Sequence, residues 1–270
     1  MVEHDRQEII GHILKKIIIR MDFQDIIRVS NNGLKEIQTV CFKNNLDASL
    51  TRTLSPFDFD FSDYLTEMNI PYEYIKDITS HVFFNRQENL TVEVNQFFIK
   101  VTQDVGNDYI RFSEMERIFL ALVKVLQTNE EIRTRRFSLT KTNEVFYENP
   151  KKLVQDFRKE IVGLDFYGDM VDWMNPLSQM NQTLNFMVDD LHVNVAKLLD
   201  NGIIENKPLI RLLLQFEALC VDKPFVEPAD LLTQMNEQIY NVFKASLSEE
   251  GLKKISVGER LGDYHEQISD

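Results

Sequence analysis

The chain has 270 residues, of which 43% are hydrophobic, enough to bury the core of one large domain or two smaller ones. Its 43 acidic residues exceed its 30 lysines and arginines, so the formal net charge is −13. A field of that sign repels nucleic acid and anionic membranes unless basic residues gather on one face, and it therefore disfavours both as partners.

Cysteine usage and hydropathy predict a cytoplasmic protein. Cys41 and Cys220 lie far apart in apolar surroundings, which favours two reduced core thiols over a disulfide. Charges interrupt the first residues, and no apolar run approaches the roughly 18 residues of a membrane-spanning helix. We therefore expect neither a signal peptide nor a transmembrane segment.

The N-terminal third predicts a strand, a helix and an aromatic segment. Apolar residues of one parity over 13–23 are typical of a half-buried strand. After a turn at 31–33, the apolar spacing over 34–41 favours a short amphipathic helix. Three phenylalanines over 54–64 alternate with Asp58, Asp60 and Ser62, which fits an edge strand or an aromatic-rich loop.

The middle of the chain predicts a strand, a helix and a strand behind a hairpin. A strand over 81–85 turns at 87–89 into a strand over 90–103, which bulges near Gln96 where the apolar phase shifts. Ser113 and Glu116 have the spacing of a capping box, so we expect a helix to begin there. Its predicted apolar stripe is Met115, Ile118, Phe119, Leu122, Val125 and Leu126. Residues 132–146 return to β-type composition.

Further along, Pro150 precedes a short predicted helix over 153–161. Alternation over 184–195 changes phase at Asp189–Asp190, which predicts one bulged strand or a tight hairpin. Residues 200–202 have the composition of a turn. The apolar run over 209–219 is typical of a strand buried on both faces, and two helices follow, one over 228–247 and a short one capped by Ser248.

Both parts of the chain place strands in hairpins ahead of a helix. We therefore predict an α+β fold, with antiparallel sheets each backed by amphipathic helices. The similar order of elements favours two similar halves, over residues 1–162 and 163–270, and one continuous domain is the alternative.

This order of elements resembles a sporadically distributed bacterial family of uncharacterised proteins over the full length of the chain. The points of likeness are the strand over 13–23, the strand over 90–103 ahead of a helix, the Arg-rich strand over 132–146 with Asn143, and the helix over 231–247. The strand-rich halves also look loosely similar to the fold of the export chaperone SecB, an antiparallel sheet backed by helices. The resemblance implies a fold and supplies no catalytic residues.

The first candidate site is a basic cluster in the strand over 132–146. Its members are Arg133, Arg135, Arg136 and Lys141. Arginine suits phosphate oxygens, so the cluster predicts an anion or nucleic-acid contact, although on a strand Arg136 projects opposite to the other three. The favoured alternative is cross-strand pairing with Glu93 or another carboxylate.

The second candidate site consists of Phe57, Phe59 and Phe61. Aromatic residues that alternate with acids on an exposed edge can bind a partner's strand or a basic peptide. The favoured alternative is that these rings cap the core.

Motifs for catalysis and cofactor binding are missing from the sequence. It has no phosphate-binding loop, dinucleotide fingerprint, nucleophile elbow or paired-histidine metal motif. Asp189, Asp190 and His192 lie together, but nothing near them in the sequence supplies the further ligands that a metal needs. We therefore expect no cofactor, no metal and no enzymatic activity.

These observations predict a non-enzymatic intracellular protein that binds another protein through sheet edges or an apolar groove, with homo-oligomerisation left open. The alternative is a nucleic-acid- or nucleotide-binding component of a bacterial defence or counter-defence system, in which the strand from Arg133 to Lys141 makes the contact. A third possibility is an enzyme whose site carries no recognisable motif.

Overall fold

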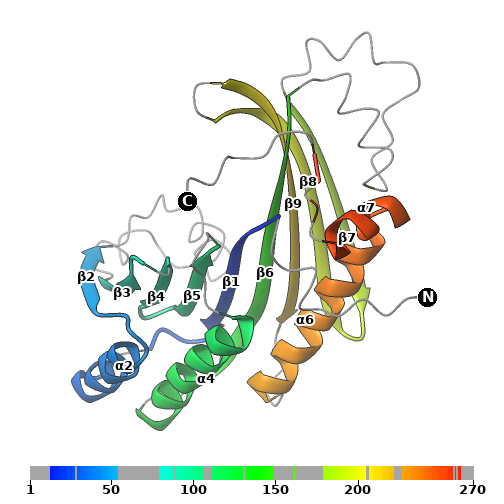
Figure 1. Ribbon diagram of the computed structural model, residues 1–270. Coiled ribbons are helices and arrows are strands. Elements are labelled where there is room, and N and C mark those ends of the chain that lie inside the picture. Colours follow the sequence, from blue (N-terminus) through cyan, green and yellow to red (C-terminus); the bar gives the residue numbers. More distant parts are fainter. Residues whose placement is uncertain are drawn as a thin grey trace. The chain divides into compact units, whose positions relative to one another are not determined.

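The computed structural model describes residues 13–27, 29–53, 79–87, 89–105, 111–129, 132–148, 161, 179–204, 207–221, 227–257, 259 and 261–262. These residues contain nine strands and four helices (Figure 1). The strands are β1 (Leu14–Phe23), β2 (Ala48–Thr53), β3 (Thr79–Asn85), β4 (Leu90–Val94), β5 (Phe98–Asp104), β6 (Thr134–Tyr147), β7 (Gln179–Val188), β8 (Leu191–Ile204) and β9 (Lys207–Val221). The helices are α2 (Asn31–Lys43), α4 (Phe112–Asn129), α6 (Pro228–Ala245) and α7 (Glu249–Ser256).

The predicted α+β class with antiparallel strands is confirmed. The hydrogen-bonded strand order is β2-β3-β4-β5-β1-β6-β9-β8-β7, and consecutive strands pair antiparallel from β2 to β5 and again from β7 to β9. The chain divides into two compact units. The first unit comprises Ile18–Ser138 and Cys220–Leu232, and the second comprises Met1–Ile17, Leu139–Leu219 and Thr233–Asp270.

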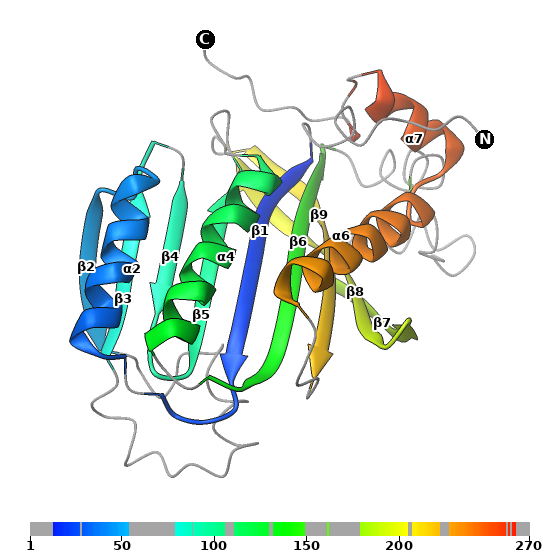
Figure 2. The same cartoon turned by 90° about the horizontal axis from the view of Figure 1, so that it is seen from below.

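In the first unit, α2 and α4 cover one face of the strands (Figure 2). Ser30 caps α2, because its hydroxyl accepts from the Gly33 amide at 3.0 Å. Helix α4 begins at Phe112, slightly earlier than the predicted capping box, and the Arg111 amide donates to the Glu114 side chain at 3.1 Å. Five of the six predicted stripe residues of α4 are buried, and Phe119 packs against Phe137 of β6 with ring centroids 5.5 Å apart.

In the second unit, the β7–β8 and β8–β9 pairs are long and antiparallel, with ten residues of β7 in register with β8. Helix α6 packs on this unit through an edge-to-face contact between Phe243 and Phe216 of β9, at 5.8 Å between ring centroids. Ser248 caps α7 as predicted, since its hydroxyl accepts from the Gly251 amide at 3.0 Å.

Three predicted strand features differ from the structure. The expected bulge near Gln96 is a turn, so that β4 and β5 form a hairpin. The expected turn at 200–202 lies inside β8, where these residues pair with β9. Strand β9 alternates buried and half-buried residues instead of being buried on both faces. Local composition predicted these three features, but pairing with the neighbouring strands determined the structure instead.

Strand β1 is more deeply buried than the half-buried strand that its sequence predicts. Its four apolar residues of one parity are buried as expected, but Arg20 and Asp22 on the other face are buried too, with 6% and 1% exposed. The predicted helix over 153–161 and the predicted boundary between 162 and 163 lie outside the described residues, apart from Ile161. No helix in the described part of the chain is long and apolar enough to cross a membrane.

Candidate functional site

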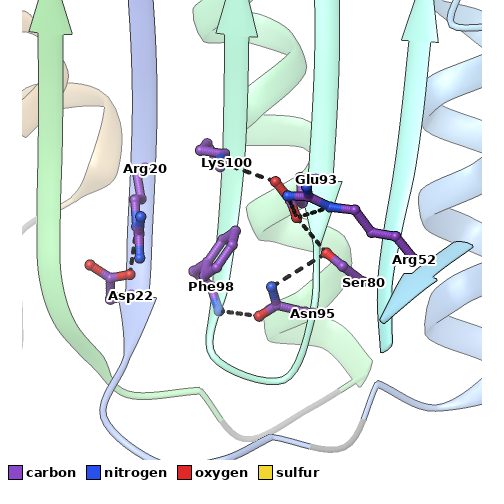
Figure 3. Close-up of polar contacts among 8 residues, drawn as sticks. All are labelled: Arg20, Asp22, Arg52, Ser80, Glu93, Asn95, Phe98 and Lys100. Carbon is purple, nitrogen blue, oxygen red and sulfur yellow. Dashed lines mark hydrogen bonds and ion pairs between the residues drawn. The ribbon is translucent and has the colours of Figure 1, made fainter. Parts of the chain in front are cut away.

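The first unit carries a polar network on the sheet face opposite to α2 and α4, which we call the charged face (Figure 3). It consists of Arg20, Asp22, Arg52, Ser80, Glu93, Asn95, Phe98, Lys100 and Arg136. Because residues opposite each other on paired strands share a face, the register that pairs Glu93 with Lys100 places both on this face. Its residues lie on strands β1 to β6 and, for Asn95, in the turn between β4 and β5.

Glu93 is the centre of the network on β4. Its Oε1 accepts from Arg52 Nη2 at 2.6 Å and from the Ser80 hydroxyl at 2.7 Å, and its Oε2 lies 3.1 Å from Lys100 Nζ. Burial works to raise the pKa of Glu93, but the charge of Lys100 and the hydrogen bonds from Ser80 and Arg52 outweigh it and hold the pKa below its usual range. Glu93 is therefore a fully paired carboxylate.

Asp22 is the second buried carboxylate of the charged face. Arg20 Nε donates to its Oδ1 and Arg136 Nε donates to its Oδ2, both at 2.7 Å. The Arg20 guanidinium also lies over the Phe98 ring, 4.3 Å from the centroid, and Lys100 Nζ lies 5.4 Å from the same centroid. Phe98 thus links the Asp22 and Glu93 clusters.

Asn95 closes the network at the turn between β4 and β5. Its Oδ1 accepts from the Phe97 and Phe98 amides at 2.8 and 3.0 Å, and its Nδ2 donates to Ser80 at 3.4 Å. Both carboxylates of the network are bound by cations, and all of these except Arg20, which shares β1 with Asp22, come from other strands. The charged face therefore acts chemically as a set of cross-strand ties that fix strand register.

The second unit carries a surface of the opposite kind, which we call the uncharged edge. It is strand β7, residues Gln179–Val188, and it contains no Asp, Glu, Lys or Arg. Since 27% of the chain is charged, a ten-residue segment carries about three charges on average. Strand β7 ends the strand order, and no other strand of the described residues pairs with its outer side.

Apolar side chains are exposed along this edge. The exposed fractions are 46% for Leu184, 37% for Phe186 and 56% for Met187. The register places Leu184 opposite Val195 and Phe186 opposite Val193 of β8, and those valines are buried. An apolar face that is covered at β8 is therefore open at β7, one strand spacing of about 4.8 Å away.

The turn that joins β7 to β8 holds this edge in register. Asp189 and Asp190 have φ angles of 47° and 67°, a left-handed pair that suits a two-residue hairpin turn. Of the two readings that the sequence left open over 184–195, the tight hairpin is therefore correct.

The predicted basic cluster is divided among different partners. Arg136 donates to Asp22 on the charged face, whereas Lys141 Nζ donates to Asn236 Oδ1 of α6 at 2.6 Å. Arg133 is exposed just ahead of β6, and Arg135 is half-buried. Phe57, Phe59 and Phe61 lie outside the described residues, so both of their interpretations stay predictions.

Sequence reasoning named Glu93 only as a possible pairing partner of the basic cluster, and it did not single out Asp22 or the uncharged edge. A signal for the charged face was present, because Arg20 and Asp22 interrupt the apolar run over 17–23. A signal for the edge was also present, namely ten consecutive residues without a charge in an acidic chain. Neither signal tells which strand lies at the edge of a sheet, since that depends on strand order.

Comparisons with known proteins add little information about the function of this chain. No family model and no curated protein matches the chain. Among solved structures, the substrate-free duplicated taurocyamine kinase from Schistosoma mansoni is similar over 85% of this chain, with 10% sequence identity and a TM-score of 0.32. This chain spans 33% of the length of that one.

The kinase match corrects one expectation from the sequence. The expectation that the protein is not an enzyme is withdrawn, because the matching structure is that of an enzyme. At a TM-score of 0.32 the likeness supports no particular fold or activity. The resemblance to a bacterial family and to the SecB fold stays a prediction.

Proposed function

We propose that this is an intracellular binding protein that takes up an extended segment of a protein chain by strand addition along β7. The observation that carries the proposal is the uncharged edge itself, with ten residues ending the strand order and exposed Leu184, Phe186 and Met187. In strand addition the main-chain groups of the edge supply affinity, and alternate side chains supply specificity.

The absence of charge on β7 supports this function. Edge strands that must stay unpaired are usually short, or carry lysine, proline or a bulge that blocks a further strand. Strand β7 is ten residues long and pairs with β8 without interruption, and it contains no lysine and no proline. It therefore lacks the usual protection against pairing.

The order of elements within each part of the chain supports the proposal further. Strands β3, β4 and β5 form a meander followed by α4, and strands β7, β8 and β9 form one followed by α6. We propose that these are two similar halves, in which β3 corresponds to β7. Strand β3 is paired with β2, whereas no described strand pairs with the outer side of β7.

Two matched variants test this function. Leu184→Lys places a charge on the uncharged edge, and Leu50→Lys places the same charge on β2, where the wild-type leucine is equally exposed at 46%. We expect tagged wild-type protein and Leu50→Lys to capture the same protein partner from the native cell, and Leu184→Lys to lose it. Quantitative mass spectrometry of the captured proteins gives the comparison.

A partner that Leu184→Lys retains at wild-type level would contradict binding at β7. The same samples test the nucleic-acid alternative, because nucleic acid bound through the basic cluster is released by salt and is lost in Arg133→Ala. Nucleic acid captured in that manner, with no protein dependent on Leu184, would favour the alternative function.

A further inference from the structure

We propose that the strand added to β7 is the β7 strand of a second copy of this chain, so that the protein forms a symmetric dimer through its uncharged edge. This inference rests on the proposed strand addition and names its partner. The side chains of β7 carry the argument, because they are complementary to themselves.

The polar residues of β7 are amides and a hydroxyl, which both donate and accept hydrogen bonds. They are Gln179, Asn181, Gln182, Thr183 and Asn185. Two identical strands of this composition meet without like-charge repulsion, although each chain has a net charge of −13. A strand without charge also has no means of selecting a different partner by charge complementarity.

One antiparallel register matches the apolar residues of the two strands. When Asn185 lies opposite Asn185 of the partner, Leu184 lies opposite Phe186 and Thr183 lies opposite Met187. Aromatic and aliphatic residues directly opposite each other stabilise an antiparallel pair. The same arrangement brings the exposed apolar residues of both edges together.

This pairing is closed by its symmetry. A two-fold axis through Asn185 pairs residues 182–188 of β7 in both copies, so that only the first three residues of each β7 stay outside the pairing, too few to take up a third chain. The other end of the strand order is β2, which is only six residues long and carries Arg52. The association therefore stops at a dimer.

The first test is the molar mass in solution by light scattering. We expect twice the 31.8 kDa of one chain for the wild type and for Leu50→Lys, and the mass of one chain for Leu184→Lys. The dimer fraction at a fixed concentration is expected to rise with salt, because salt screens the repulsion between two acidic chains.

The second test fixes the register by disulfide cross-linking. In Asn185→Cys the two introduced residues face each other with Cα atoms about 5 Å apart, within the range of a disulfide. In Thr183→Cys they are separated by four residues along the strand, about 13 Å, and no cross-link is expected. Both native cysteines are buried, so the wild type serves as the background.

The outcomes separate this inference from the function on which it rests. A wild type that stays monomeric, a dimer that Leu184→Lys leaves intact, or cross-linking of Thr183→Cys without Asn185→Cys would overturn the symmetric pairing. If the wild type is monomeric and still loses its captured protein partner in Leu184→Lys, the dimer fails while strand addition at β7 stands.

Discussion

The two strands at the ends of the strand order, β2 and β7, differ in how readily a further strand could pair with them. Strand β2 has six residues, and its Arg52 reaches across β3 to the buried carboxylate of Glu93. Strand β7 has ten residues, no charge and exposed apolar side chains. The comparison teaches that β2 is held by an ion pair and protected from further pairing, whereas β7 is left open to it.

The largest effect should follow from removing the anchor of the β2 edge. In Glu93→Gln, Arg52 and Lys100 lose a buried anionic partner, and we expect the free energy of unfolding in urea to fall by about 3 kcal/mol. Glu144→Gln is the control, since its ion pair with Arg211 is partly exposed and should contribute about 1 kcal/mol or less. Equal losses of unfolding free energy in the two variants would contradict the conclusion that the buried ion pairs of Glu93 stabilise the fold more than a partly exposed pair does.

The second largest effect concerns the turn beside that anchor. In Asn95→Ala the Phe97 and Phe98 amides lose their acceptor in a buried turn, so we expect a loss of about 2 kcal/mol. Asn85→Ala is the matched control, because Asn85 accepts from the Gln87 amide in an exposed turn. Its expected loss is within about 0.5 kcal/mol, and a control that is as costly as Asn95→Ala would contradict this account.

A smaller effect should follow from neutralising the β2 edge itself. Arg52 is 44% exposed, so its pair with Glu93 is partly screened and Arg52→Ala should cost about 1 kcal/mol or less. The amides of β2 should then exchange hydrogen faster, while those of β7 keep their wild-type rate. Arg86→Ala, in the exposed turn after β3, is the control and should change neither rate.

The smallest expected effect is on the pH dependence of the free energy of unfolding. Burial opposes the ion pairs and hydrogen bonds that lower the pKa of Glu93, so the net effect of this carboxylate on that dependence is small. Since folding lowers this pKa, the ionised carboxylate stabilises the fold above the ordinary glutamate pKa of about 4.3. This stability is lost as the pH falls through the lower pKa of the folded state. Urea unfolding at successive pH values should show the gap between wild type and Glu93→Gln narrowing below pH 4.3, and a constant gap would argue against it.

The sequence predicted the helices and strands more accurately than it predicted which strands lie next to one another. Five of the six predicted stripe residues of α4 and the cap of α7 are confirmed, because a 3.6-residue period and a Ser248 cap are local features. The hairpin at Asn95 was read as a bulge, since a phase shift of one residue has the same signature in both structures.

The candidate surfaces depend on strand order, which local patterns do not encode. Arg52 and Glu93 are 41 residues apart in the chain and meet only because β2 pairs with β3 and β3 with β4. Of the predicted basic cluster, Arg136 was matched to a carboxylate in general terms, but its partner Asp22 lies 114 residues earlier. The alternation over 184–188 indicated a strand and gave no sign that this strand is an edge.

The two-residue turn at Asp189–Asp190 has a consequence for how this chain tolerates insertions and deletions. Side chains alternate between the two faces of a strand, so adding or losing one residue at this turn shifts β7 by one position against β8. Leu184 and Phe186 would then move to the face now occupied by Asn185 and Met187. The length of the turn therefore determines which face of the sheet carries the exposed apolar residues of this edge.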